Sequence, residues 1–243
     1  MPRTTTRQAK GTTRRKPRWI RNLKILGLLT FVLVVGVAAA GYWVWLGALN
    51  SAASKLGDLD TMRVRLETAP TTILSSDNKV LYSFSNENRE WVTIQQVPQL
   101  VKDATIAAED KRFYEHSGID TVAIVRQLFT NVRERRVAGG ASTLTMQLAK
   151  RLYSGSEKTI ERKLGDMALA VQMERRFTKD AILELYLNQV FYGSWAYGVR
   201  RAADVYFGKP LEKLTVGEAA LIARCVRRPS SENPFVNLPK AVE

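Results

Sequence analysis

The sequence has 243 residues, a single cysteine and a net charge of +14 at neutral pH. A single cysteine excludes an intrachain disulfide framework, and the length suits one compact domain with flanking segments. Nine of the 37 lysines and arginines lie in residues 1–24, which contain no acid, and the remaining 28 face 23 acids. The basic excess is therefore mainly a tail, and we expect no nucleic-acid partner because an uncharged stretch follows it directly.

That stretch, residues 25–49, contains no charged side chain. At about 1.5 Å per residue, a helix of this length crosses a hydrocarbon core of roughly 30 Å. It exceeds the apolar core of a signal peptide, although Ala38-Ala39-Ala40 resembles a cleavage site and keeps cleavage open as an alternative. The positive-inside rule places the tail in the cytoplasm. We expect 1–24 to be a cytoplasmic tail and 25–49 a single-pass transmembrane anchor.

The rest of the chain favours a mainly α fold with a short β-hairpin near its start. Residues 50–95 are expected to form a juxtamembrane linker, in which two β-rich runs within 71–85 flank the turn residues 76–79. Beyond it, helical patterns cover about 98–115, 120–135, 142–152, 159–176, 179–190, 196–205 and 215–227. Thr178 is the predicted N-cap of the helix that begins at Lys179. Gly139-Gly140 and residues 153–157 predict loops.

Two adjacent acids end the first of these helical patterns. Glu109 and Asp110 follow apolar residues at helical spacing and precede His116, the only histidine. A carboxylate at the end of a core helix can serve as a general base. On its own, however, such a pair is more often a solvated surface feature.

Four segments in order extend this observation: EDKRFYEHSGID (109–120), GGASTLTMQLAK (139–150), RKLGD (162–166) and KDAILELYLNQVFYG (179–193). Together they resemble the peptidoglycan glycosyltransferases, the transglycosylase module of class A penicillin-binding proteins and of monofunctional transglycosylases. The resemblance implies a lysozyme-like α-helical domain over 96–243, with a cleft and a membrane-embedded lobe. The family continues beyond an Asn-Pro like Asn233-Pro234 into a further motif, so we expect this domain to be truncated at its C-terminus.

The resemblance also implies roles for particular residues. Glu109 is expected to be the catalytic base, and Asp166 a second catalytic carboxylate that could also meet a metal ion. Substrate contacts are expected from Asp110, Ser142, Thr143, Thr145, Gln147, Arg162 and Lys163, and structural roles from Phe113, His116, Gly118 and Asn188. Without the resemblance, Arg162, Lys163 and Asp166 would read as a surface ion-pair cluster. The family commonly has glutamine at Met146 and glutamate at Asp166, which puts the roles of these two positions in doubt.

The function implied is an inverting glycosyltransferase that polymerises lipid II into β-1,4-linked glycan strands and releases polyprenyl pyrophosphate. A loosely bound divalent cation, Mg²⁺, would assist by bridging a carboxylate and the pyrophosphate. The domain would lie outside the bacterial inner membrane, with the bilayer, the nascent glycan strand and other cell-wall synthesis and division proteins as partners. Two alternatives remain open: a non-catalytic module that binds lipid II or glycan, and a hydrolase that cleaves glycan.

Overall fold

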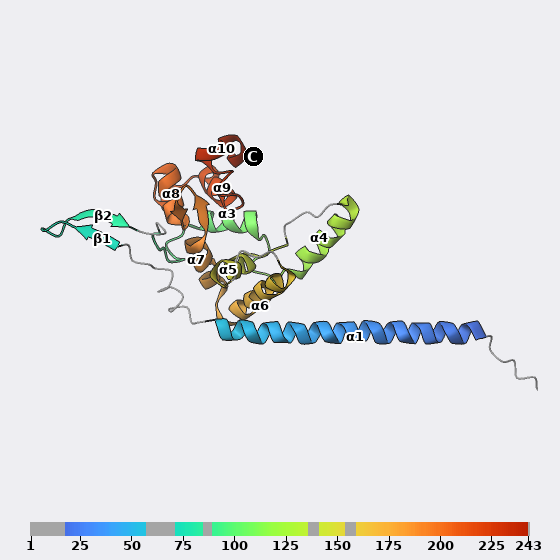
Figure 1. Cartoon of the computed structure of the whole chain (residues 1–243). Helices are drawn as coiled ribbons and strands as arrows, with labels where there is room; N and C mark the ends of the chain where they lie inside the picture. The colour runs from blue at the N-terminus through green and yellow to red at the C-terminus, as the bar shows by residue number, and fades with distance from the viewer. Residues whose placement is uncertain (1–17, 57–70, 85–88, 136–140, 154–158, 243) are drawn as a thin grey trace, which may run out of the picture. The chain divides into compact units, whose positions relative to one another are not determined.

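A computed structural model describes residues 18–56, 71–84, 89–135, 141–153 and 159–242. The chain divides into two units, 1–46 and 47–243. The described parts are mainly helical, with two short pairs of strands, as the sequence predicted (Figure 1). Most of the predicted tail, the linker segments 57–70 and 85–88, the Gly139-Gly140 pair and the loop residues 154–157 lie outside the described residues.

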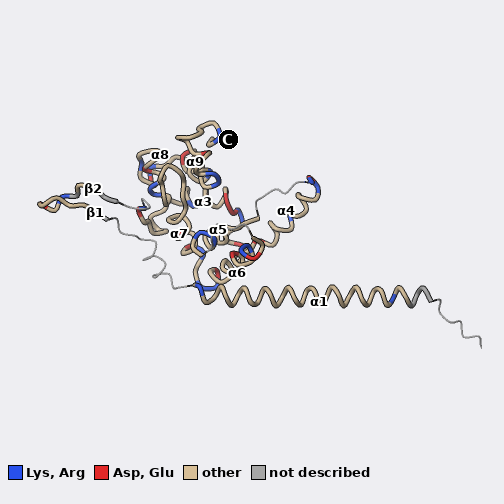
Figure 2. The backbone as a smooth tube through the Cα atoms, in the orientation of Figure 1, with Lys and Arg blue, Asp and Glu red and all other residues tan. Residues whose placement is uncertain are grey.

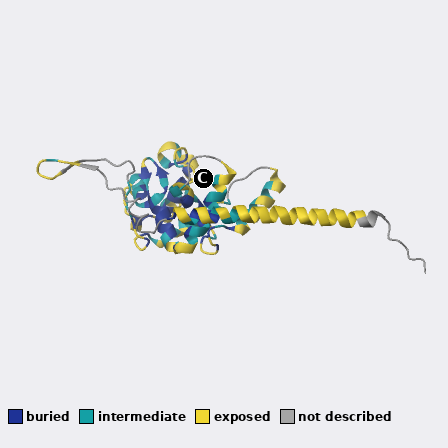
Figure 3. Cartoon of the chain, turned by 60° about the horizontal axis from the view of Figure 1, so that its bottom comes forward, coloured by how far each residue is buried: buried dark blue, intermediate teal, exposed yellow. Residues whose placement is uncertain are grey.

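Helix α1, Arg18–Lys55, contains the predicted anchor. Its segment Asn22–Lys55 is long and apolar enough to cross a membrane, by length and composition. Residues 22–44 are exposed along the helix (Figure 3), and charged residues are confined to the regions near its two ends (Figure 2). A helix satisfies its own backbone hydrogen bonds, which is what a lipid environment requires of a spanning segment.

The last residues of α1 belong to the second unit and pack in it. Leu49, Ala52 and Leu56 are buried. The Arg176 guanidinium donates to the carbonyl oxygens of Leu56 at 2.8 Å and Ala53 at 3.2 Å. The final carbonyls of a helix lack intrahelical partners, so Arg176 satisfies groups that would otherwise need water.

The predicted hairpin is confirmed. Strand β1, Thr71–Leu74, pairs antiparallel with β2, Val80–Phe84. The turn between them contains Asn78 with φ of 60°, a left-handed conformation that asparagine tolerates well.

The predicted helices are present with shifted ends. They are α3 (Gln99–Glu109), α4 (Thr121–Glu134), α5 (Leu144–Tyr153), α6 (Ile160–Arg176), α7 (Lys179–Gln189), α8 (Val199–Phe207) and α9 (Val216–Cys225). Helix α3 packs on α9, and α5 packs on both α6 and α7 (Figure 1). Fully buried side chains of these elements, among them Leu144, Leu148, Met173 and Tyr186, form the core.

Two helix boundaries were wrong, and two helices were missed. The helix predicted over 98–115 ends at Glu109, because Asp110 leaves helical geometry with φ −156° and ψ 78°. The helix predicted from 196 begins at Val199, because strands β3 (Phe191–Gly193) and β4 (Ala196–Tyr197) precede it. The short helices η1 (Leu211–Lys213) and α10 (Pro234–Val242) were not predicted.

Thr178 is the N-cap of α7, as predicted, and its hydroxyl oxygen accepts the Ala181 N–H at 3.2 Å. Thr178→Ala removes this acceptor and is expected to lower the free energy of unfolding by about 1 kcal/mol. Urea denaturation would measure the change. Thr178→Ser keeps an oxygen at the same place and should retain most of the stability; equal losses in both variants would contradict the capping role.

Cys225 is a free cysteine with a fully buried side chain. Burial raises the pKa of its thiol to about 11. At pH 8 the thiol therefore stays protonated, and since the thiolate is the reactive form, we expect alkylation of the folded protein to be far slower than that of the denatured protein. Mass spectrometry after iodoacetamide treatment would measure this, and equal rates in the two states would contradict it.

Candidate active site

Glu109 is the last residue of α3 and is half-buried at the edge of a cavity of about 210 Å³. The cavity is lined by Ala107, Ala108, Glu109, Asp110, Lys111, Arg112, Asp120, Ala123, Arg126, Ala141, Ser142 and Thr143. It thus joins the end of α3, the turn after it, the start of α4 and the residues before α5. Four of the predicted site residues meet here: Glu109, Asp110, Ser142 and Thr143.

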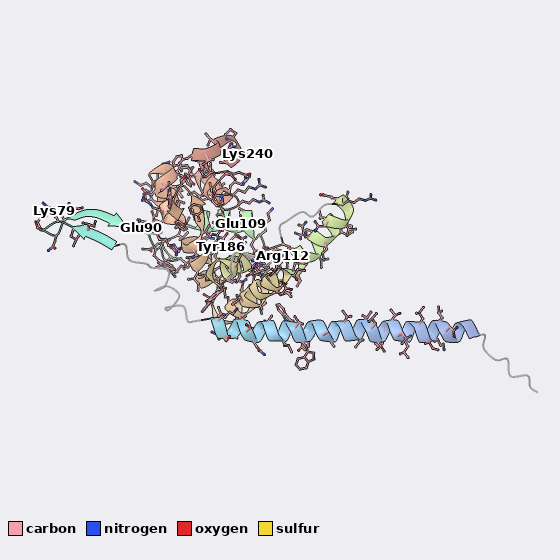
Figure 4. The ribbon with its side chains drawn as sticks, viewed as in Figure 1. Lys79, Glu90, Glu109, Arg112, Tyr186 and Lys240 are labelled. Atoms are coloured by element: carbon pink, nitrogen blue, oxygen red, sulfur yellow. The ribbon has the colours of Figure 1, made fainter. Side chains whose placement is uncertain are left out.

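A fifth predicted residue, Gln147 of α5, contacts the glutamate directly. Its side-chain Nε2 donates to Oε2 of Glu109 at 2.8 Å. Its Oε1 accepts from the hydroxyl of Tyr186, on α7, at 3.2 Å. Figure 4 labels Glu109 and Tyr186. The structure therefore uses Gln147 to hold the carboxylate, whereas the sequence predicted a contact with substrate.

The Tyr186 hydroxyl is a donor at any physiological pH. Its side chain is fully buried on α7. Burial, followed by the negative charge of Glu109, raises the pKa of Tyr186 well above its ordinary value. The proton therefore stays on the phenol oxygen and is available to Gln147.

Asp110 ties the turn after α3 to the start of α5. Both carboxylate oxygens lie within hydrogen-bond distance of His116 Nε2, at 3.2 and 3.0 Å, and Oδ2 also accepts the Leu144 N–H at 3.0 Å. Asp110 and His116 are both buried. Asp110 thus contacts protein through both oxygens, although the sequence predicted it as a substrate contact.

Gly118 and Thr143 complete this connection. The Thr143 hydroxyl donates to the Gly118 carbonyl oxygen at 2.7 Å and accepts the Met146 N–H at 3.2 Å. Gly118 has φ of +92°, and a Cβ there would lie 2.8 Å from the backbone carbonyl of Ala170 on α6. Only glycine permits this approach. Thr143 is buried, whereas Ser142 is exposed beside the cavity, so of these two predicted contacts Ser142 is the accessible one.

Thr145 also points inward. Its hydroxyl donates to Glu174 Oε1 at 2.6 Å, and the same oxygen accepts from Lys179 Nζ at 2.8 Å. Lys179 Nζ lies 4.5 Å from the centroid of the buried Phe113 ring, within range of a cation–π contact. This network joins α5, α6, α7 and the turn after α3, and the parts played by Glu174 and Lys179 were not predicted.

The three predicted residues of α6 do not line the cavity. Arg162 Nη1 donates to Asp166 Oδ2 at 2.6 Å, and Asp166 is buried while Lys163 is exposed. The ion-pair interpretation therefore describes Arg162 and Asp166 in this structure. Since α6 packs on α5, these residues lie on the helix next to the one that holds Gln147.

Asn188, on α7, lies in the core and away from the cavity lining. Its Oδ1 accepts the Val92 N–H at 2.9 Å, and its Nδ2 donates to the carbonyl oxygens of Val92 and Glu184, both at 2.8 Å. This two-sided contact anchors the segment before α3 to α7.

Three cations that line the cavity were not predicted: Lys111, Arg112 and Arg126. Arg112, labelled in Figure 4, contacts Glu115 at 2.8 Å and Asp120 at 3.7 Å. The signal in the sequence was the Lys-Arg pair directly after the acids. The cavity lining thus holds three cations beside three acids, Glu109, Asp110 and Asp120.

A permanent metal site does not fit the described residues. Among them, no group of three or more His, Cys, Asp or Glu side chains could hold an ion. Asp166 is the predicted carboxylate, and it already accepts from Arg162. A divalent ion here would take most of its ligands from water and from a phosphorylated substrate.

Comparisons with known proteins identify the family of the chain. A protein-family model described as transglycosylase matches residues 77–243. Penicillin-binding protein 1A of Neisseria cinerea is 40% identical over 211 residues, which cover 87% of this chain and 26% of that protein. The protein of the same name from Aquifex aeolicus is 46% identical over 157 residues, covering 65% and 22%.

A crystal structure of penicillin-binding protein 1A from Haemophilus influenzae aligns with 71% of this chain and 16% of that one at 25% identity. The TM-score of this alignment is 0.37. The chain spans about a quarter of the length of the first of these relatives. Because the family model matches more than half of the sequence, the chain belongs to the transglycosylase family.

Proposed function

We propose that this chain is a peptidoglycan glycosyltransferase that polymerises lipid II into β-1,4-linked glycan strands with inversion at the anomeric carbon. The observation that carries the proposal is the Glu109 carboxylate at the edge of a cavity whose lining includes Lys111, Arg112 and Arg126. The Gln147 amide holds one of its oxygens. In the part of the chain that the structure describes, the other oxygen has no hydrogen-bond partner.

In the proposed reaction, Glu109 takes the proton from the 4-hydroxyl of the N-acetylglucosamine of the acceptor. That oxygen attacks the anomeric carbon of the N-acetylmuramic acid of the donor, and the bond from this carbon to the diphosphate breaks. The electron pair leaves with the polyprenyl diphosphate. An α-linked donor attacked from the opposite face gives a β linkage, and a preorganised base and cations lower the barrier.

The departing diphosphate needs positive charge. We propose that Lys163 and Arg162 supply it, with Asp166 keeping Arg162 in place. Mg²⁺ bound to the diphosphate would neutralise further charge, since this ion retains water and binds through phosphate oxygens. Arg162 would have to exchange part of its contact with Asp166 for the diphosphate.

The proposed substrate carries a long lipid, so the domain would work at a membrane surface. Helix α4 has no buried residue and exposes Val125, Leu128, Phe129 and Val132. We propose that this apolar face enters the bilayer as part of the expected membrane-embedded lobe. We propose that α1 spans the inner membrane once and that the domain lies outside it, with the nascent strand and other cell-wall proteins as partners.

The test is incubation of the detergent-purified chain with labelled lipid II, with and without Mg²⁺, and separation of the products on a gel. A ladder of polymer that a muramidase digests would support the proposal. Lipid II that binds without forming polymer would overturn it in favour of a non-catalytic binding module. Digestion of preformed glycan by the chain itself would indicate the hydrolase alternative.

A further inference from the structure

A hydrogen-bond chain of three side chains ends on the proposed base. The Tyr186 hydroxyl contacts Oε1 of Gln147 at 3.2 Å, and Nε2 of Gln147 contacts Oε2 of Glu109 at 2.8 Å. The three residues come from α7, α5 and α3, so the chain connects separate helices. Its function depends on which way each group donates.

The chemistry of the groups fixes that direction. An ionised carboxylate only accepts hydrogen bonds, so the group that Gln147 turns toward Glu109 must be its NH₂. The carbonyl oxygen of the amide then faces Tyr186, and an oxygen that only accepts requires the phenol to donate. If the Gln147 amide were reversed, its oxygen would face the Glu109 carboxylate, and these two acceptors could form no hydrogen bond with each other.

Tyr186 is held rigidly enough to impose this orientation. Its side chain is fully buried, and so are the side chains from Ile182 to Asn188 that surround it on α7. The helix is fixed at its start by the Thr178 cap and near its end by the contacts of Asn188 with Val92. The hydroxyl therefore stays in one place, whereas Gln147 is only half-buried and has flexible side-chain torsions.

We propose that Tyr186 is a positioning residue for the reaction: it fixes the amide of Gln147, which holds Oε2 of Glu109 and leaves Oε1 to take the proton of the acceptor hydroxyl. The inference rests on the proposed function, because it takes Glu109 as the base. It assigns a distinct role to each carboxylate oxygen. Without the phenol, the amide rotates freely, and the carboxylate spends less time in the reactive geometry.

A purely structural role for Tyr186 is the alternative, and a neighbouring tyrosine provides a matched control. Tyr192 is fully buried, and burial raises its pKa too, while the charge of Arg151 lowers it and that of Glu109 raises it. Among the described residues, however, its hydroxyl has no hydrogen-bond partner. Tyr192→Phe therefore removes a buried hydroxyl of the same region without touching Gln147.

The experiment compares lipid II polymerisation by the wild-type chain with that by four variants: Tyr186→Phe, Tyr192→Phe, Gln147→Ala and the double variant Tyr186→Phe/Gln147→Ala. We expect Tyr186→Phe to lower kcat about tenfold, the effect of one lost hydrogen bond on a barrier, with KM changed less than twofold. Tyr192→Phe should match the wild type. In the Gln147→Ala background, Tyr186→Phe should have no further effect, because both act through one contact.

The inference would be overturned if Tyr186→Phe had the kcat of the wild type, or if the losses of the two single variants multiplied in the double variant. In either case, polymerisation by the wild type would still support the proposed function. Equal losses in Tyr186→Phe and Tyr192→Phe would assign the effect to packing and also overturn it. A wild-type chain that makes no polymer would overturn both proposals together.

Discussion

Glu109→Gln is expected to reduce the rate of glycan polymerisation by about 10²- to 10⁴-fold, the range that a general base contributes. Glutamine has nearly the same shape, and its amide oxygen can still accept the Gln147 N–H that Glu109 accepts at 2.8 Å. It cannot take up the proton of an attacking hydroxyl. The initial rate of polymer formation from labelled lipid II would measure the loss.

The control is Glu115→Gln, in the turn that follows α3. Glu115 is exposed, does not line the cavity and pairs with Arg112 at 2.8 Å. We expect near wild-type activity, since an exposed ion pair contributes about 0–1 kcal/mol. Urea denaturation should give Glu109→Gln a stability close to that of the wild type. If Glu109→Gln polymerised at the wild-type rate, another group would have to be the base.

Local patterns in the sequence were enough to predict most elements of the fold. Thr178 before an apolar helical repeat predicted the start of α7, because a cap acts on residues only three positions away. The hairpin followed from turn residues between two β-rich runs. Where an end depended on tertiary contacts, prediction failed: α3 ends at Glu109 because Asp110 turns to bind His116 and Leu144, and no local signal marks that change.

The motifs identified part of the candidate site but not the directions of its side chains. Thr143, Thr145 and Gln147 share one segment and all can hydrogen-bond, so the sequence treated them as one set of substrate contacts. In the structure, Thr143 binds Gly118, Thr145 binds Glu174 and Gln147 binds Glu109. Which partner each one finds depends on how α5 packs against α6 and α7, and this is information that a single sequence does not carry.

Gly118→Ala is expected to lower the free energy of unfolding by about 2 to 5 kcal/mol. Two costs add: roughly 1 to 2 kcal/mol for a side chain at positive φ, and about 1 to 3 kcal/mol for overpacking. The new Cβ would lie 2.8 Å from the Ala170 carbonyl carbon and oxygen and 2.9 Å from the Val171 nitrogen, all in the backbone of α6. Urea denaturation would measure the loss.

Gly208→Ala separates these two costs. Gly208 ends α8 with φ of +59°, and a Cβ there would meet nothing within 4 Å, so only the conformational cost of about 1 to 2 kcal/mol applies. The excess loss in Gly118→Ala over Gly208→Ala then measures how tightly the turn after α3 is held against α6. The Gly118 carbonyl accepts from Thr143, next to the start of α5, and Ala170 lies on α6 one turn beyond Asp166. The same clash should therefore displace the start of α5 from α6 and lower the rate of polymerisation as well. Equal losses in the two variants would mean that the turn moves aside freely, and the contacts of Asp110 and Thr143 would then not fix Glu109 in place.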